Sequence, residues 1–361
     1  MTDESYIQLA LEIAKKGIGE VSPNPLVGCI LVKDDRIIGA GYHEKFGANH
    51  AEINAIENAK EPVDGSTLFV NLEPCTHFGK TPPCVDKIIE RKIKRVVIGT
   101  LDMNPLVSGT GVKKLKSAGI DVKVGVLEKE CVNLNKFFFK YITKKIPYIT
   151  LKAAQTLDGK IADLKGGSQW ISSIQSRKFV HHLRANYDAV LIGAGTVNKD
   201  DPSLTVRLTD GRNPRRIILD SALILKSDKK LFTRNNDKKT IIITSRNNEK
   251  KSKVKKLQSF GVKVIFAKED KDGNLNLKNV LKELAKNQIA SVLVEGGSRV
   301  FSSFIRSNLF DDIFLFISPK IIGQGIPVVD DIGVKDIKRT LKVRIKNYEM
   351  IGEDLMLQLE R

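Results

Sequence analysis

The feature that most constrains this chain is one histidine followed by two widely spaced cysteines. They lie in the runs His50-Ala51-Glu52, Glu73-Pro74-Cys75 and Pro82-Pro83-Cys84. One imidazole and two thiolates can hold a zinc ion and leave its fourth position open for water, which is the arrangement of a catalytic zinc site. A neighbouring carboxylate can then take a proton from that water and pass it on. We therefore predict one zinc per chain, bound by His50, Cys75 and Cys84, with Glu52 as the proton carrier.

The spacing also predicts where these residues lie. Residues two apart do not share a face of a regular helix, so His50 and Glu52 can meet one metal only where a helix begins. Cys84 follows two prolines, which favour a first helical turn, and the helix dipole there stabilises a thiolate. The alternative is that all four cysteines are inert and buried. We predict that role for Cys29, in the apolar run Leu26–Val32, and for Cys131.

Length and charge limit the class of protein. A chain of 361 residues suggests two domains, and residues 147–361 contribute +15 of the net charge of +18. A basic half suits nucleic acid or small phosphorylated ligands, or it reflects a lysine-rich proteome. No apolar run reaches the roughly 18 residues of a membrane span, and the acidic N-terminus does not resemble a signal peptide. With few cysteines, we expect a cytoplasmic protein.

Apolar periodicity and turn residues predict alternating strands and helices. In residues 1–146 we predict helices over 4–18, 51–59, from 84 onward and near 112–118, and strands over 27–32, 36–42, 67–72, 95–99 and 122–126. In residues 147–361 we predict strands over 148–153, 189–193, 216–219, 240–244, 263–266, 291–294 and 313–317, and helices near 176–185, 249–260, 277–287 and 298–307. This alternation is typical of α/β proteins. We predict a three-layer α/β domain over 1–146 and a second α/β domain over 147–361.

Two glycine-containing turns stand out in the second half, at Gly193–Thr196 and Gly296–Arg299. Bare backbone N–H groups where a helix begins suit a pyrophosphate, although an ordinary tight turn explains the same residues. The first turn departs from the Rossmann pattern because Asn198 stands at the third glycine position. Together they favour a dinucleotide. Trp170, the single tryptophan, suits either a core position or a flat wall beside a nicotinamide.

The first half resembles the cytidine-deaminase-like zinc deaminases, whose ligands follow a His-x-Glu and Pro-Cys pattern. The eight-residue gap between Cys75 and Cys84 departs from the commoner two-residue gap and is similar to the deaminases of riboflavin biosynthesis. The second half resembles their reductase partners, which have a dihydrofolate-reductase-like fold. The stretches that carry these resemblances are Asn24–Gly28, Asp102–Pro105, Lys152–Lys160, Ser168–Ile171, Gly193–Val197, Asp200–Arg207 and Val294–Gly297.

The resemblance implies two consecutive reactions. The first is hydrolytic deamination of 2,5-diamino-6-ribosylamino-4(3H)-pyrimidinone 5′-phosphate, and the second is reduction of the ribosyl group to ribityl with NADPH. Contacts to the deaminase substrate are implied for Asn24, Lys80 and Asn104. NADPH contacts are implied for Ala154, Trp170, Thr196, Asp200, Ser221, Gly297, Ser298, Arg299 and Val300. Contacts to the sugar phosphate are implied for Ser168, Arg184, Leu204, Arg207 and Glu295.

Other hypotheses stay open at this point. A nucleic-acid or nucleoside deaminase with a non-catalytic C-terminal binding module has the same first half. The basic stretch 226–256 lacks interleaved aromatic residues, so we favour a solvated surface there and no nucleic-acid partner. The resemblance implies a small pyrimidine ribose phosphate as ligand, and the lack of a long apolar run argues against a membrane. No general acid for the reductase is evident, since Lys152 and Asp158 suit positioning roles better. Association into a homo-oligomer is left open.

Overall fold

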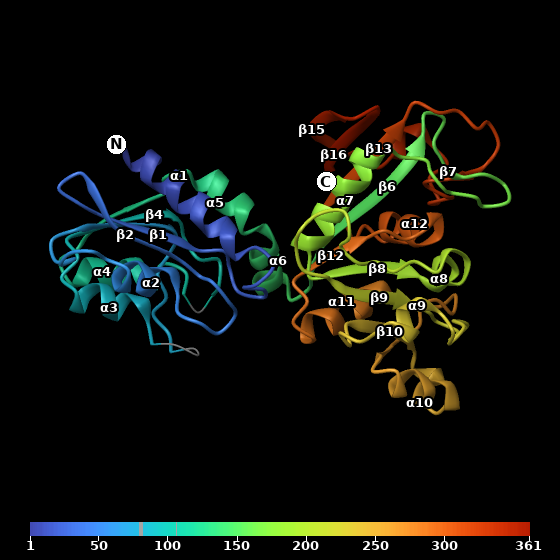
Figure 1. Cartoon of the computed structure of the whole chain (residues 1–361), viewed down its shortest axis with the longest axis horizontal. Helices are drawn as coiled ribbons and strands as arrows, with labels where there is room; N and C mark the ends of the chain where they lie inside the picture. The colour runs from blue at the N-terminus through green and yellow to red at the C-terminus, as the bar shows by residue number, and fades with distance from the viewer. Residues whose placement is uncertain (79–81, 106) are drawn as a thin grey trace. The chain divides into compact units, whose positions relative to one another are not determined.

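The computed structural model of the protein describes residues 1–78, 82–105 and 107–361. These residues form two compact units, Met1–Ile146 and Pro147–Arg361, and each unit has its own β-sheet. Figure 1 labels their elements along the chain. Within the described ranges, every helix is too short or too polar to cross a membrane.

The first unit is built on a sheet with the strand order β2-β1-β3-β4-β5. Its strands are β1 Gly28–Lys33, β2 Arg36–Tyr42, β3 Thr67–Leu72, β4 Arg95–Thr100 and β5 Asp121–Val124. Strand β1 is antiparallel to β2 and β3, whereas β3, β4 and β5 run parallel. The segments that follow β3 and β4 therefore leave the sheet at the same edge.

Helices cover both faces of this sheet (Figure 1). They are α1 Asp3–Ala14, α2 Ala51–Glu57, α3 Cys84–Glu90, α4 Thr110–Ser117, α5 Glu128–Leu134 and α6 Lys136–Lys144, with a 3-10 turn at Lys15–Gly17. Alternate residues of β1 enter two different cores: Cys29 and Leu31 pack with α2 and α3, and Ile30 and Val32 pack with α1. The predicted three-layer arrangement is thus confirmed. Cys29 and Cys131 are buried in the core, as predicted.

Helix α1 is held against the sheet by a close approach and by charge. A Cβ atom on Gly28 would meet the Ala10 carbonyl oxygen at 2.0 Å, so only glycine allows this packing. The Asp3 carboxylate accepts hydrogen bonds from both terminal nitrogens of Arg95 at 2.9 Å and from Lys123 at 2.8 Å. The bonds from Arg95 are the main cause that lowers the pKa of Asp3 to about 2.

The second unit is built on a sheet with the order β11-β10-β9-β8-β12-β6-β13-β16-β15, and a small sheet pairs β14 with β7. The strands are β6 Tyr148–Thr156, β7 Lys160–Ala162, β8 Ala189–Gly193, β9 Arg215–Leu219, β10 Thr240–Ser245, β11 Lys263–Ala267, β12 Ser291–Val294, β13 Asp312–Ser318, β14 Ile326–Pro327, β15 Arg344–Ile351 and β16 Asp354–Glu360. Strands from β11 to β13 in this order are parallel, and β16 and β15 are antiparallel additions. Strand β12 is buried along its whole length, as suits a strand covered on both faces.

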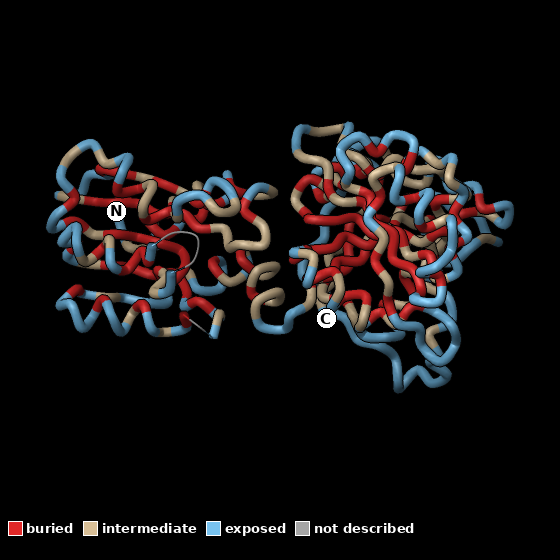
Figure 2. Tube along the Cα trace, turned by 90° about the horizontal axis from the view of Figure 1, so that it is seen from below, coloured by how far each residue is buried: buried red, intermediate tan, exposed pale blue. Residues whose placement is uncertain are grey.

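The helices of the second unit follow its parallel strands. They are α7 Ile174–Asn186, α8 Ala194–Asp200, α9 Lys230–Thr233, α10 Ser252–Ser259, α11 Leu277–Lys286 and α12 Ser298–Arg306, with 3-10 turns at Arg246–Asn248 and Ile337–Arg339. Figure 2 shows buried segments running through the centre of each unit. The sheet carries α8 and α12 at the carboxyl ends of β8 and β12, where α/β proteins bind ligands.

One predicted element needs correction, and several others were not predicted. The helix predicted over 249–260 is a 3-10 turn at Arg246–Asn248 and a helix that begins only at Ser252. Residues 128–144 form α5 and α6, and residues 344–360 form the hairpin β15–β16, which sequence periodicity did not predict. The hairpin turn has Gly352 in its first central position, with φ +65°, which was the available signal. A core position for Trp170 is excluded because this residue is 60% exposed.

Candidate metal centre and cofactor cavity

The three predicted metal ligands meet at one point of the first unit. Their ligand atoms all lie within 4.8 Å of one another. The His50 Nδ1 atom is 3.2 Å from Cys84 Sγ and 3.5 Å from Cys75 Sγ. Tetrahedral zinc with usual bond lengths sets nitrogen and sulfur ligands roughly 3.6 Å apart. The donor set and its spacing therefore fit zinc.

Two helix starts create this arrangement. His50 is the residue that precedes α2, and Cys84 is the first residue of α3, while Cys75 follows β3. The hydrogen bond from Cys84 is the main cause that lowers the pKa of Cys75 to about 4, and the bond shared with Cys75 raises the pKa of Cys84. The pair thus already holds one thiolate beside His50, which is the ionisation that a metal ligand needs.

Glu52 lies in the first turn of α2 and is only 3% exposed. Burial is the main cause that raises the pKa of its carboxyl group, and the nearby His50 opposes that shift. A carboxyl group that gains and loses a proton more readily near neutral pH suits proton transfer. The structure therefore brings Glu52 to the metal ligands, in the place that the sequence pattern predicts.

His43, which sequence analysis did not identify, orients a predicted substrate contact. Its ring lies edge-on to His50, with 5.5 Å between centroids. Nδ1 of His43 faces the Asn49 carbonyl at 3.0 Å, so it donates; Nε2 must then accept from the Asn24 amide at 3.2 Å. The amide of Asn24 is thereby fixed with its nitrogen toward His43. Lys80, which is also predicted to contact the deaminase substrate, lies outside the described residues.

Glu73 anchors the loop that carries Asn104. Its buried carboxylate accepts four backbone N–H groups, from Asp102 at 3.2 Å, Gly109 at 2.9 Å, Gly111 at 2.9 Å and Val112 at 3.1 Å. Two of these donors belong to the first turn of α4, so Glu73 caps that helix from a distance. One side chain between β3 and Cys75 thus fixes the loop from β4 to α4.

Most of the predicted cofactor and sugar-phosphate residues of the second unit surround one cavity of about 790 Å³. The predicted residues that line this cavity are Ala154, Ser168, Trp170, Arg184, Thr196, Asp200, Ser221, Glu295, Gly297, Ser298, Arg299 and Val300. Gly193 and Gly297 directly precede α8 and α12, so two helix starts face the same space. Helix starts offer free N–H groups to phosphate oxygens, which fits a dinucleotide. Trp170 stacks on the guanidinium of Arg177 at 3.9 Å and presents an exposed ring.

A buried charge cluster lies on the wall of this cavity. Arg184 and Glu295 form a two-pronged ion pair, with bonds of 2.6 and 2.8 Å. Lys152 lines the same cavity, and burial is the main cause that lowers the pKa of its ammonium group. Asp158 instead accepts from Thr156 and from the backbone of Gly323, which makes it a turn residue.

Leu204 and Arg207 are not among the described residues that line this cavity. Leu204 is buried, and Arg207 is exposed, with its guanidinium 3.4 Å from the Thr205 hydroxyl. Within 226–256 every lysine is exposed or half-buried, as predicted for a solvated surface, but β10 in the middle of this stretch is fully buried.

Comparison with known proteins places both units. Residues 1–100 match the zinc-binding region of cytidine and deoxycytidylate deaminases, and residues 147–357 match the RibD C-terminal domain. The riboflavin biosynthesis protein RibD of Aquifex aeolicus is 51% identical, with 99% of this chain and 98% of that protein covered. RibD of Escherichia coli is 35% identical, with 99% of each covered.

Solved structures agree over the whole length. The diaminohydroxyphosphoribosylaminopyrimidine deaminase/5-amino-6-(5-phosphoribosylamino)uracil reductase of Thermotoga maritima is 44% identical, with a TM-score of 0.88 and 99% of this chain and 98% of that chain covered. RibD of Acinetobacter baumannii is 35% identical, with a TM-score of 0.89 and the same coverage. A zinc deaminase unit followed by a reductase unit defines a bifunctional deaminase and reductase. The chain belongs to the RibD family of riboflavin biosynthesis proteins. Its cofactors are zinc for the deaminase and NADPH for the reductase.

Proposed function

We propose that the chain deaminates 2,5-diamino-6-ribosylamino-4(3H)-pyrimidinone 5′-phosphate in residues 1–146 and reduces the ribosyl group of the product in residues 147–361. The observation that carries this proposal is the cluster of His50, Cys75 and Cys84 beside the buried Glu52. The name printed for the Thermotoga maritima relative gives the same two activities. The rival hypothesis, a nucleic-acid deaminase with a non-catalytic C-terminal module, is not favoured by relatives that are RibD along both units.

In the deaminase, zinc when bound makes water available as a nucleophile near neutral pH. Glu52 takes one proton from that water and delivers it to the pyrimidine ring as the water oxygen bonds to the ring carbon. It then moves the second proton from the resulting hydroxyl group to the leaving amine, so that the carbonyl forms and ammonia departs. Asn24, oriented by His43, and Asn104, on the loop tied to Glu73, hold the pyrimidine. Lys80 supplies a cation for the substrate phosphate.

In the reductase, NADPH supplies the hydride. The glycine turns at Gly193 and Gly297, with Thr196, Ser298 and Arg299, hold its phosphates, and Trp170 covers its nicotinamide ring. The sequence favoured only a positioning role for Lys152, but its place in the cavity lining and a pKa lowered by burial suit it to supply the proton that reduction of ribosyl to ribityl consumes. Glu295 and Arg184 fix the charge around Lys152, and Arg207 binds the sugar phosphate.

Two substitutions test the separation of these sites. Glu52→Gln should retain zinc and abolish ammonia release while NADPH oxidation on the deaminated intermediate continues. Arg207→Ala should weaken reduction and leave deamination unchanged. Loss of both activities in either variant would contradict the assignment. Absence of NADPH oxidation in the unaltered chain, or binding of oligonucleotide in preference to NADPH, would favour the rival hypothesis.

We also propose a cytoplasmic homo-oligomer without nucleic-acid partners. The four cysteines are free, which suits a reducing compartment. Strand β15 ends the large sheet and exposes Ile345 at 60%, Tyr348 at 72% and Met350 at 61%. An exposed apolar end strand is a typical place for a second chain to dock.

A further inference from the structure

The segment Thr205–Leu208 has no regular secondary structure, yet three side chains hold its backbone at consecutive residues. The Arg184 guanidinium donates to the Thr205 carbonyl oxygen at 3.2 Å. The Asn213 side-chain oxygen accepts the Val206 N–H at 2.8 Å. Nδ1 of His181 accepts the Arg207 N–H at 2.8 Å. This number of side-chain contacts to one short loop indicates that its position matters.

Each of these side chains is itself fixed. His181 and Arg184 lie three residues apart on α7 and share one face of that helix. Arg184 is locked by its ion pair with Glu295 in the cofactor cavity. The segment is therefore attached to the cavity wall through Arg184, although Arg207 is not among the residues that line the cavity.

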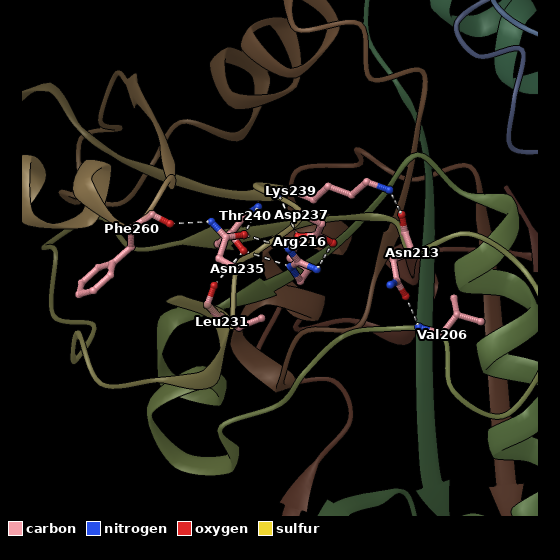
Figure 3. A network of polar contacts seen from close by, with 9 residues as sticks. All are labelled: Val206, Asn213, Arg216, Leu231, Asn235, Asp237, Lys239, Thr240 and Phe260. Carbon is pink, nitrogen blue, oxygen red and sulfur yellow. Dashed lines mark hydrogen bonds and ion pairs between the residues drawn. The ribbon is translucent and has the colours of Figure 1, made fainter. Parts of the chain in front are cut away.

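Figure 3 shows how Asn213, which holds Val206, is itself anchored. The Asn213 carbonyl oxygen accepts from the Lys239 ammonium at 2.9 Å. The backbone N–H of Lys239 donates to Asp237, which pairs with the buried Arg216 of β9. Asn213 thus ties Val206 to the beginning of β9 and β10.

The Nδ1 atom of His181 can act here only as a hydrogen-bond acceptor. It is 4% exposed, and Nδ1 also lies 3.4 Å from the Leu208 N–H. Burial, followed by the neighbouring Arg184, Arg207 and Arg177 against the opposing Glu295, lowers the pKa of His181 to about 4. The imidazole therefore stays neutral near pH 7, with its hydrogen on Nε2.

We propose that His181 is a positioning residue for the reductase: by accepting the Arg207 N–H, it sets the Arg207 guanidinium where the phosphate of the substrate binds. This rests on the proposed role of Arg207. His181 is not among the described residues that line the cofactor cavity, and in this proposal it acts only through the backbone of the segment.

A pair of substitutions separates this role from simple core packing. In His181→Asn the amide oxygen takes the place of Nδ1, whereas in His181→Gln it takes the place of Nε2. We expect His181→Gln to raise KM for the phosphorylated substrate roughly ten- to a hundred-fold, the range for one lost bond to a charged group, with kcat changed much less. His181→Asn should restore KM to within a few-fold of the unaltered chain. The affinity for NADPH and the deaminase activity should be unchanged in both variants.

The outcomes separate the two proposals. Equal KM values in His181→Gln and the unaltered chain, no rescue by His181→Asn, or a matching loss of NADPH affinity would overturn the role of His181. If Arg207→Ala leaves KM unchanged, the phosphate contact of the proposed function is wrong and this inference falls with it. If Arg207→Ala raises KM and His181→Gln does not, only the inference about His181 fails.

Discussion

Replacement of Glu73 by glutamine should destabilise the first unit and impair deamination. The carboxylate of Glu73 accepts four backbone N–H groups, two on each oxygen. Glutamine keeps one acceptor oxygen and turns a donor amide group toward two of those N–H groups, so two bonds are lost. A hydrogen bond to a charged group contributes about 1.5–3 kcal/mol. The loss is roughly 3–6 kcal/mol before relaxation, and we expect about 3 kcal/mol after it.

Urea unfolding with two probes measures this effect. Trp170 is the only tryptophan and lies in the second unit, so its fluorescence reports that unit alone. Release of zinc into a chromophoric chelator reports the first unit. The glutamine variant of Glu73 should release zinc at lower urea and deaminate more slowly, while its fluorescence transition and NADPH oxidation stay unchanged.

A matched control sits on α2. Glu57 is exposed, and among the hydrogen bonds of the described residues its carboxylate accepts only one, from the Asn49 amide at 3.3 Å. Glu57→Gln should therefore change the free energy of unfolding by less than about 0.5 kcal/mol. If the Glu73 and Glu57 variants release zinc at the same urea concentration, the anchoring role of Glu73 is refuted. An equal shift of the fluorescence transition would show that the effect is not confined to the first unit.

Three further outcomes are expected. The pKa of Asp3 is lowered from 3.8 to about 2, so the stabilising contribution of its carboxylate is complete above pH 3.8 and is lost as the pH falls through about 2. In acid titrations, the difference in unfolding free energy between the unaltered chain and Asp3→Asn should therefore close over that interval. Gly28→Ala should destabilise the first unit by more than about 2 kcal/mol in urea, because the new Cβ meets the Ala10 carbonyl, and wild-type stability would contradict that contact. A chain with Ile345→Lys and Tyr348→Lys should sediment as a smaller species than the unaltered chain; identical sedimentation would exclude β15 from the subunit interface.

The sequence predicted best what depends on near neighbours. The spacing of His50 and Glu52, and the prolines before Cys84, indicated helix starts, and the structure has both. The metal ligands then follow because few residue types bind zinc. Strands β3 and β8 were also predicted, because strands that are buried on both faces are short and mostly apolar runs.

Sequence reasoning failed where a residue acts through distant partners. The donors to Glu73 lie 29 to 39 residues away in the chain, and those to His181 lie 26 and 27 residues away. No local pattern distinguishes such a residue from any other glutamate or histidine. The hairpin β15–β16 was missed because β15 is exposed on nearly every residue and lacks the usual alternation of buried and exposed positions.

X-ray absorption at the zinc edge, together with elemental analysis of active protein, tests the central claim most directly. We expect one zinc per chain, with two sulfur neighbours at about 2.3 Å, one imidazole nitrogen, and one further light atom from water. Cys84→Ser should remove one sulfur from that shell and leave NADPH oxidation intact. Active protein without zinc, or zinc with no sulfur neighbour, would contradict the centre formed by His50, Cys75 and Cys84.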